Sequence, residues 1–139
     1  MRNRAIILDD NASIRNILWT FFNKRGYEVF SFPDPQLCPL HTLQACPCPA
    51  ESSCADIIVS DVKMENGNGV DFLERLIQKG CRQRHFALMS GNFSEADQVR
   101  ARRLNCRLFS KPLDIAQLTA WVEEVERATP VGRTLHNWA

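Results

Sequence analysis

Short apolar runs alternate with stretches of helical periodicity along most of the chain. Five runs are typical of buried strands, and they occupy residues 4–8, 27–32, 56–60, 86–89 and 108–109. Apolar residues at helical spacing follow in the segments 14–21, 70–77 and 115–125, and a further helix is expected over 94–104. This alternation predicts a doubly wound α/β fold, in which a five-stranded parallel sheet has helices on both faces.

Local signals mark where several of these helices begin and end. Asn11 and Asp114 are suited to cap the first and last helices, and Ser94, with Asp97 three residues later, resembles a helix-start box. Gly26 predicts the end of the first helix, and Pro130 that of the last. The first helix is expected to bury the stripe formed by Ile14, Ile17, Leu18 and Phe21.

The segment 33–54 departs from this regular order, because its five prolines are incompatible with a continuous helix. Only residues 40–45 are expected to form a helical turn or two. The segment also contains a histidine and four cysteines: His41, Cys38, Cys46, Cys48 and Cys54. A zinc site, a redox site and a disulfide are alternatives here, but the spacing favours a loop with reduced thiols.

The composition favours a globular protein and argues against proteins that bind nucleic acid or membranes. The chain has 139 residues, 45% of them hydrophobic, which suits one globular domain. A net charge of +1, with no long basic run, argues against direct contact with nucleic acid or an anionic membrane surface. We see no signal peptide and no apolar run long enough to span a membrane, so a cytoplasmic location with reduced cysteines is expected.

Polar residues that suit phosphate chemistry follow four of the five predicted strands. They are Asp9 and Asp10 after the first, Asp61 after the third, Ser90 after the fourth and Lys111 after the fifth. The carboxyl ends of parallel strands meet at one edge of the sheet, so these side chains are expected to lie together. Clustered carboxylates suit Mg²⁺, while a lysine and a hydroxyl can bind phosphoryl oxygens. The set predicts phosphoryl transfer to a carboxylate.

These residues, in this order and spacing, resemble the receiver domain of two-component response regulators. The resemblance extends from Arg4 to about Ala128, and the domain is expected to occupy residues 1–129, followed by a tail at 130–139. It rests on the segments Leu8-Asp9-Asp10, Val59-Ser60-Asp61-Val62-Lys63-Met64 with Gly69, Met89-Ser90-Gly91 and Lys111-Pro112. The last segment resembles the lysine and typically cis proline of that family. The implied fold is flavodoxin-like, with strand order 2-1-3-4-5.

The resemblance implies a switch. Asp61 would form an acyl phosphate, with Lys111 and Ser90 binding its oxygens and a sensor histidine kinase or phosphotransfer protein supplying the phosphate. Mg²⁺ would be held by Asp10, Asp61 and the backbone carbonyl of Lys63, with Asp9 helping through water. Phosphorylation would alter the face formed by the fourth helix, fifth strand and fifth helix. A downstream protein, or a second copy of the chain in a homodimer, would bind that face.

Some positions differ from the family pattern. Glu65 stands where the family often has proline, and Leu108 stands where it usually has an aromatic switch residue, so we favour absence of that switch over its replacement by Phe109. A pseudo-receiver that docks proteins without phosphate is the main alternative. An aspartyl phosphatase and a cofactor-binding flavodoxin-like protein fit less well. Asp56 and Asp71 are interpreted as solvated or capping carboxylates.

Overall fold

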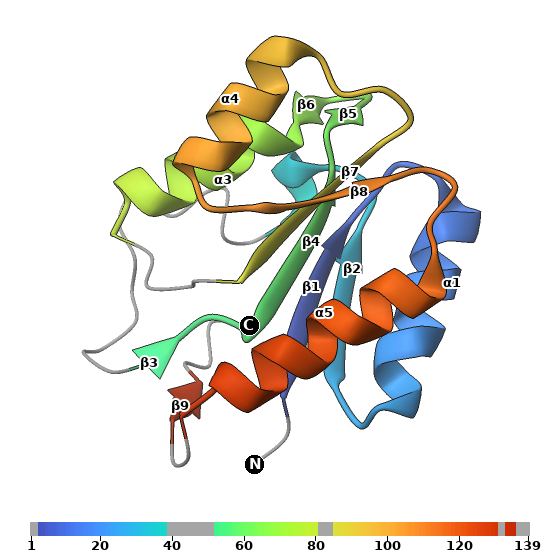
Figure 1. Cartoon of the computed structure of the whole chain (residues 1–139), viewed down its shortest axis with the longest axis vertical. Helices are drawn as coiled ribbons and strands as arrows, with labels where there is room; N and C mark the ends of the chain where they lie inside the picture. The colour runs from blue at the N-terminus through green and yellow to red at the C-terminus, as the bar shows by residue number, and fades with distance from the viewer. Residues whose placement is uncertain (1–2, 39–51, 81–84, 131–132, 136–139) are drawn as a thin grey trace.

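The protein is an α/β sandwich built on one five-stranded parallel sheet (Figure 1). The computed structural model describes residues 3–38, 52–80, 85–130 and 133–135. The strands lie in the order β2-β1-β4-β7-β8, which confirms the predicted flavodoxin-like order. Their bounds are β1 Arg4–Leu8, β2 Glu28–Phe32, β4 Ile57–Asp61, β7 Phe86–Ser90 and β8 Arg107–Ser110.

Four helices of the described residues cover the sheet. They are α1 (Ala12–Lys24), α3 (Gly69–Gln78), α4 (Glu95–Arg103) and α5 (Ile115–Ala128). Asn11, Ser94 and Asp114 cap α1, α4 and α5 as predicted, each accepting a hydrogen bond from a backbone N–H of the first turn. None of the described helices is long and apolar enough to cross a membrane.

The sheet separates two hydrophobic cores. Alternate residues of the central strands face α1 and α5 on one side, where Phe22, Trp121 and Val122 are buried. The intervening residues face α3 and α4 on the other side, where Leu73 and Ala101 are buried. Both faces are therefore covered, which explains why the central strands are almost wholly apolar.

The buried stripe of α1 is rotated relative to the prediction, and α5 likewise leaves one apolar residue at its start exposed. Ile17 of α1 is 52% exposed and Ile115 of α5 is 43% exposed, whereas Phe22 and Trp121 lie in the core. Leu18 and Phe22 are four residues apart, so they share the face of α1 that meets the sheet. The expected burial of Ile17 is wrong because apolar spacing alone permits several neighbouring faces.

Short elements surround the sheet. A 3₁₀ turn, η1 (Pro35–Leu37), follows β2, and β5 (Lys63–Met64) pairs with β6 (Gly67–Asn68) in a small antiparallel hairpin after β4. Near the start of β1 and β4, β3 (Ser52–Ser53) pairs in parallel with β9 (Thr134–Leu135) (Figure 1). The helical turn expected at 40–45 lies outside the described residues.

The interpretation of Asp56 as a solvated or capping carboxylate is wrong. Asp56 is 6% exposed and directly precedes β4. Its carboxylate forms a two-pronged ion pair with the guanidinium of Arg133, with N–O distances of 2.7 and 2.8 Å, and also accepts the backbone N–H of Arg4. The pair connects the segment before β9 to the edge of the sheet at which β1 and β4 begin.

Candidate functional site

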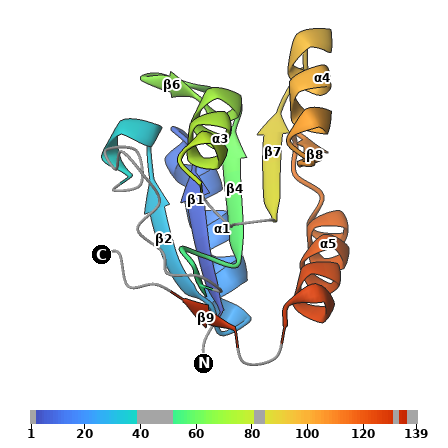
Figure 2. The same cartoon turned by 90° about the vertical axis from the view of Figure 1, so that its left-hand side faces the viewer.

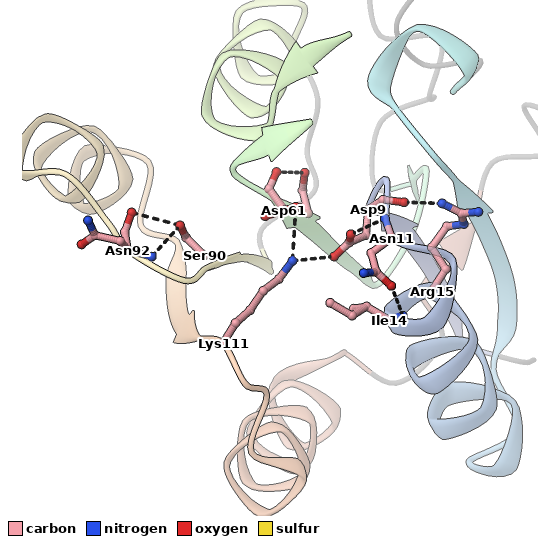
Figure 3. A network of polar contacts seen from close by, with 9 residues as sticks. Asp9, Asn11, Ile14, Arg15, Asp61, Ser90, Asn92 and Lys111 are labelled. Atoms are coloured by element: carbon pink, nitrogen blue, oxygen red, sulfur yellow. Dashed lines mark hydrogen bonds and ion pairs between the residues drawn. The ribbon is translucent and has the colours of Figure 1, made fainter. Parts of the chain in front are cut away.

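The predicted site residues gather at the carboxyl edge of the sheet (Figure 3). Asp9 follows β1, Asp61 is the last residue of β4, Ser90 is the last of β7, and Lys111 follows β8. The parallel register aligns Asp61 with Met89 and Ser90 with Ser110, so these strand ends stop at nearly the same level. The topology therefore brings together residues that are up to 102 positions apart.

The Lys111 ammonium bridges two of the carboxylates. Its Nζ lies 3.1 Å from Oδ2 of Asp9 and 3.2 Å from Oδ2 of Asp61. The peptide bond between Lys111 and Pro112 is cis, as the sequence resemblance implied. The lysine reaches from the edge strand β8 across the end of β7, and this geometry places one cation between two acids (Figure 3).

The loop after β1 holds one acid inside and leaves the other outside. The Asp9 side chain is fully buried and its Oδ1 accepts the backbone N–H of Asn11, whereas Asp10 is exposed. The backbone carbonyl of Asp9 accepts a 2.6 Å hydrogen bond from Arg15, one turn into α1. Arg15 was not among the predicted site residues, although its place one helical turn after the acidic pair was a signal that could have indicated it.

Burial and charge shift the ionisation of the two bridged groups. Burial, followed by the negative charge of Asp9, raises the pKa of Asp61, and Lys111 only partly opposes this shift. For Lys111, burial alone would lower the pKa, but the hydrogen bond to Asp9 and the charges of both acids raise it overall. The lysine therefore stays cationic, while the ionised Asp61 carboxylate is held in a site that disfavours its charge.

The donor set fits a hard divalent cation. One carboxylate oxygen from each of Asp9, Asp10 and Asp61 can be chosen so that all three lie within 4.8 Å of one another. Carboxylate oxygens with an open, solvent-facing side suit Mg²⁺, which binds one or two carboxylates and retains several waters. The exposed Asp10 supplies that open side. The predicted acidic cluster is thus present in the fold.

Comparison with known proteins gives the same family. Residues 5–123 match the response regulator receiver domain. The chain belongs to that family. It is 26% identical over 122 residues to sporulation initiation phosphotransferase F of Bacillus subtilis, covering 85% of this chain and 89% of that protein. It is 27% identical over 118 residues to a probable transcriptional regulatory protein of Picosynechococcus, covering 84% of this chain but only 46% of that relative. The chain thus spans about half of the latter's length.

Solved structures share the receiver fold. The chemotaxis protein CheY4 of Vibrio cholerae superposes with a TM-score of 0.71 at 20% identity, covering 90% of this chain and 99% of that one. The signal receiver domain of an HD domain-containing protein of Pseudomonas fluorescens gives 0.74 at 17% identity, covering 92% and 97%. At these identities the likeness establishes the architecture of the receiver domain.

Ser90 of this receiver domain is turned toward its own loop. Its side chain is nearly buried, and its hydroxyl both accepts from the backbone N–H of Asn92 and donates to the Asn92 carbonyl, at 3.1 Å each. Lys63, by contrast, is exposed in the hairpin that follows Asp61. Of the predicted site residues, Asp61 and Lys111 are in direct contact. The Ser90 hydroxyl forms its hydrogen bonds with Asn92 instead.

Gly69 of the receiver domain lies against the backbone of the predicted phosphoacceptor. A Cβ at Gly69 would come within 2.2 Å of the Asp61 carbonyl oxygen and 2.6 Å of the Ser60 hydroxyl. The Ser60 hydroxyl itself donates to that Asp61 carbonyl at 2.9 Å, and the Gly69 N–H donates to Val62. The start of α3 can approach Asp61 this closely because residue 69 has no side chain.

Leu108 and Phe109 lie on opposite faces of β8. Leu108 is half-buried against the core under α3 and α4. Phe109 is buried under α5, where its ring makes an edge contact with Trp121 at a centroid distance of 5.8 Å. Phe109 and Leu108 therefore pack in different cores, and the absence of the aromatic switch stays a prediction.

Proposed function

We propose that this receiver domain is a phosphoacceptor in which Asp61 takes a phosphoryl group from a phosphohistidine. The donor is a sensor histidine kinase or a histidine-containing phosphotransfer protein. The observation that carries the proposal is the position of the Lys111 ammonium, 3.2 Å from an Asp61 carboxylate that belongs to a three-carboxylate cluster. A structural ion pair needs only one carboxylate for its cation. A phosphoryl site needs a carboxylate to accept the phosphate, and positive charge beside it to offset the charge of the phosphoryl oxygens.

The chemistry is a displacement at phosphorus. An Asp61 carboxylate oxygen forms the new bond, the bond from phosphorus to the donor imidazole nitrogen breaks, and the electron pair stays on that nitrogen. Lys111 lies beside the acceptor and offsets negative charge on the phosphoryl oxygens as they approach. The Ser90 hydroxyl is proposed to exchange its contact with Asn92 for a phosphoryl oxygen after transfer.

Asp10 and Asp61, with the Lys63 backbone carbonyl, would hold Mg²⁺, and Asp9 would orient its waters. When bound, Mg²⁺ supplies positive charge that offsets the developing charge on phosphoryl oxygens. The buried Asp9 carboxylate is held in place by the Asn11 backbone N–H and by Lys111, whereas the Asp10 side chain is open to solvent. The surface formed by α4, β8 and α5 is the proposed readout face for a downstream protein or a second copy of the chain.

Intact-protein mass spectrometry after incubation with acetyl phosphate tests the proposal. Wild type is expected to gain one phosphoryl group with Mg²⁺ and none after chelation, and Asp61→Asn is expected to gain none. Because small donors are poor mimics of some kinases, a phosphorylated histidine phosphotransfer domain is the second donor. Failure with both, in a folded protein, would favour the alternative of a phosphate-independent docking module.

A further inference from the structure

The residues that follow β2 contact the β5–β6 hairpin from outside the sheet. This hairpin begins two residues after Asp61, at Lys63. Its tip faces η1, whose Pro35 is buried against Gly67: a Cβ at Gly67 would lie only 2.9 Å from the Pro35 ring. Figure 2 shows the cyan turn beside β6. The close approach requires glycine at position 67, because the proline ring cannot move aside like a flexible side chain.

Two polar contacts strengthen this approach. Oδ2 of Asp34, a residue only 8% exposed, accepts a hydrogen bond from the Asn66 side-chain amide at 3.3 Å. The Gln36 amide reaches the Asn66 carbonyl at 3.4 Å, and the other Asp34 oxygen accepts the Gln36 backbone N–H at 2.9 Å. Asp34 therefore caps η1 and holds the hairpin tip with the same carboxylate.

The same stretch of chain also contacts the other side of the acidic cluster. The backbone N–H of Asp9 donates to the carbonyl of Phe32, the last residue of β2, at 3.2 Å. Residues 32–36 thus connect the loop that carries Asp9 with the hairpin that follows Asp61. The hairpin is fixed at its base as well, because Lys63 pairs with Asn68 and Asn68 caps α3.

We propose that residues 32–36 are a positioning element for the phosphoacceptor loop, with Asp34 and Pro35 holding Asn66 and Gly67 so that the Lys63 carbonyl is placed for Mg²⁺. The proposal rests on the phosphoacceptor function proposed above. It supplies a physical role for the chain that follows β2, namely to hold the turn that contains Glu65, a residue without the fixed φ of proline.

Asn66→Ala and Gly67→Ala test the element, because the first removes the contact to Asp34 and the second forces the hairpin away from Pro35. Each is expected to weaken Mg²⁺ binding, measured by calorimetry, about threefold to tenfold, the value of one or two ordinary hydrogen bonds. Phosphorylation by acetyl phosphate should slow at low Mg²⁺ and recover at saturating Mg²⁺.

The exchanged pair Asp34→Asn with Asn66→Asp retains the net charge and a donor facing an acceptor, so it should bind Mg²⁺ nearly as wild type.

Arg25→Ala is the matched control, because it removes an ion pair with Glu126 at the far end of α1 and should lower thermal stability without changing Mg²⁺ affinity. If the hairpin variants lower stability as this control does but bind Mg²⁺ like wild type, the contact is merely structural and the proposal is overturned. If wild type binds Mg²⁺ but takes no phosphate, the phosphoacceptor function fails while the Mg²⁺ comparison still decides the positioning role. A wild type that binds no Mg²⁺ overturns both.

Discussion

Lys111 and Asp9 form an ion pair whose acidic partner has no exposed side-chain surface. The Asp9 carboxylate cannot turn to solvent, so the ammonium at 3.1 Å has a fixed neighbour that orients it toward Asp61. A buried charge that loses its partner is costly, and the pair is therefore expected to persist while Asp61 changes its own charge or ligands. This arrangement makes Asp9 a support for the lysine, a role distinct from that of Asp10 at the surface.

Lys111→Met should slow phosphorylation of Asp61 strongly. The variant keeps an unbranched side chain that ends where the ammonium group of lysine would begin, so it removes the cation beside the acceptor. Loss of one such charged donor typically costs about 10²-fold in rate. The rate of mass gain with acetyl phosphate at saturating Mg²⁺ measures the effect. Lys24→Met, at the exposed end of α1, is the control. A Lys111→Met rate within about twofold of wild type would contradict the assigned role.

Asp61→Asn should stabilise the metal-free protein at neutral pH. Burial and the charge of Asp9 raise the pKa of Asp61 above its ordinary 3.8, so ionisation of this group opposes folding. The wild type is then most favoured below that ordinary pKa and loses stability as the pH rises through the raised value. Asparagine cannot ionise, so the variant's advantage should be present at pH 7 and vanish in acid.

Urea denaturation in EDTA, from about pH 3 to pH 7, measures this difference. Glu65→Gln, which neutralises an exposed carboxylate in the neighbouring hairpin turn, is the control for a general change in net charge. A variant that is less stable than wild type at pH 7 would show that the Asp61 carboxylate is favourably paired, which is the opposite of what its burial beside Asp9 predicts.

Gly69→Ala should destabilise the fold and displace the acceptor. The added methyl group meets the Asp61 backbone carbonyl at 2.2 Å, and backbone atoms there are fixed by the sheet. Overpacking of this kind costs about 1–3 kcal/mol. Gly91→Ala is matched in chemistry but has open space around the new methyl group, so its free energy of unfolding should change by less than about 0.5 kcal/mol. Equal effects in the two variants would contradict the close approach of α3 to Asp61.

Arg133→Ala should lower stability although it lies far from the site. It leaves the buried Asp56 carboxylate without its two-pronged guanidinium partner. Breaking such a pair costs about 3–5 kcal/mol when both partners are buried, and Arg133 is still 15% exposed, so about 2 kcal/mol is expected. Arg107→Ala removes an exposed pair with Glu124 at 4.0 Å and should cost less than about 1 kcal/mol by the same urea measurement.

The sequence predicted the acidic cluster because its members follow strands. Asp9, Asp61 and Lys111 each come directly after, or at the end of, a short apolar run, and the rule that parallel strand ends share one edge needs no distant information. The sheet order and the caps at Asn11, Ser94 and Asp114 followed from equally local signals.

The errors and omissions come from contacts between distant segments. The sequence pattern indicates a surface acid at Asp56, and the structure shows a buried one. The burial could not be predicted because the partner, Arg133, lies 77 residues away in a segment without periodicity. The contact of Pro35 with Gly67 likewise joins two very short elements, η1 and β6, and neither has a hydrophobic pattern that would indicate it. Asp9 and Asp10 are predicted as neighbours in one site, but only the structure distinguishes the buried acid from the exposed one.

Borohydride trapping of the phosphorylated protein tests the central claim most directly. Borohydride reduces an aspartyl phosphate to homoserine, and peptide sequencing by mass spectrometry then identifies which aspartate carried the phosphate. Homoserine is expected at position 61 alone, and its formation should depend on Mg²⁺ and on a phosphoryl donor. Homoserine at position 9 or 10, or none in a protein that has gained phosphate, would contradict the assignment of Asp61 as the acceptor.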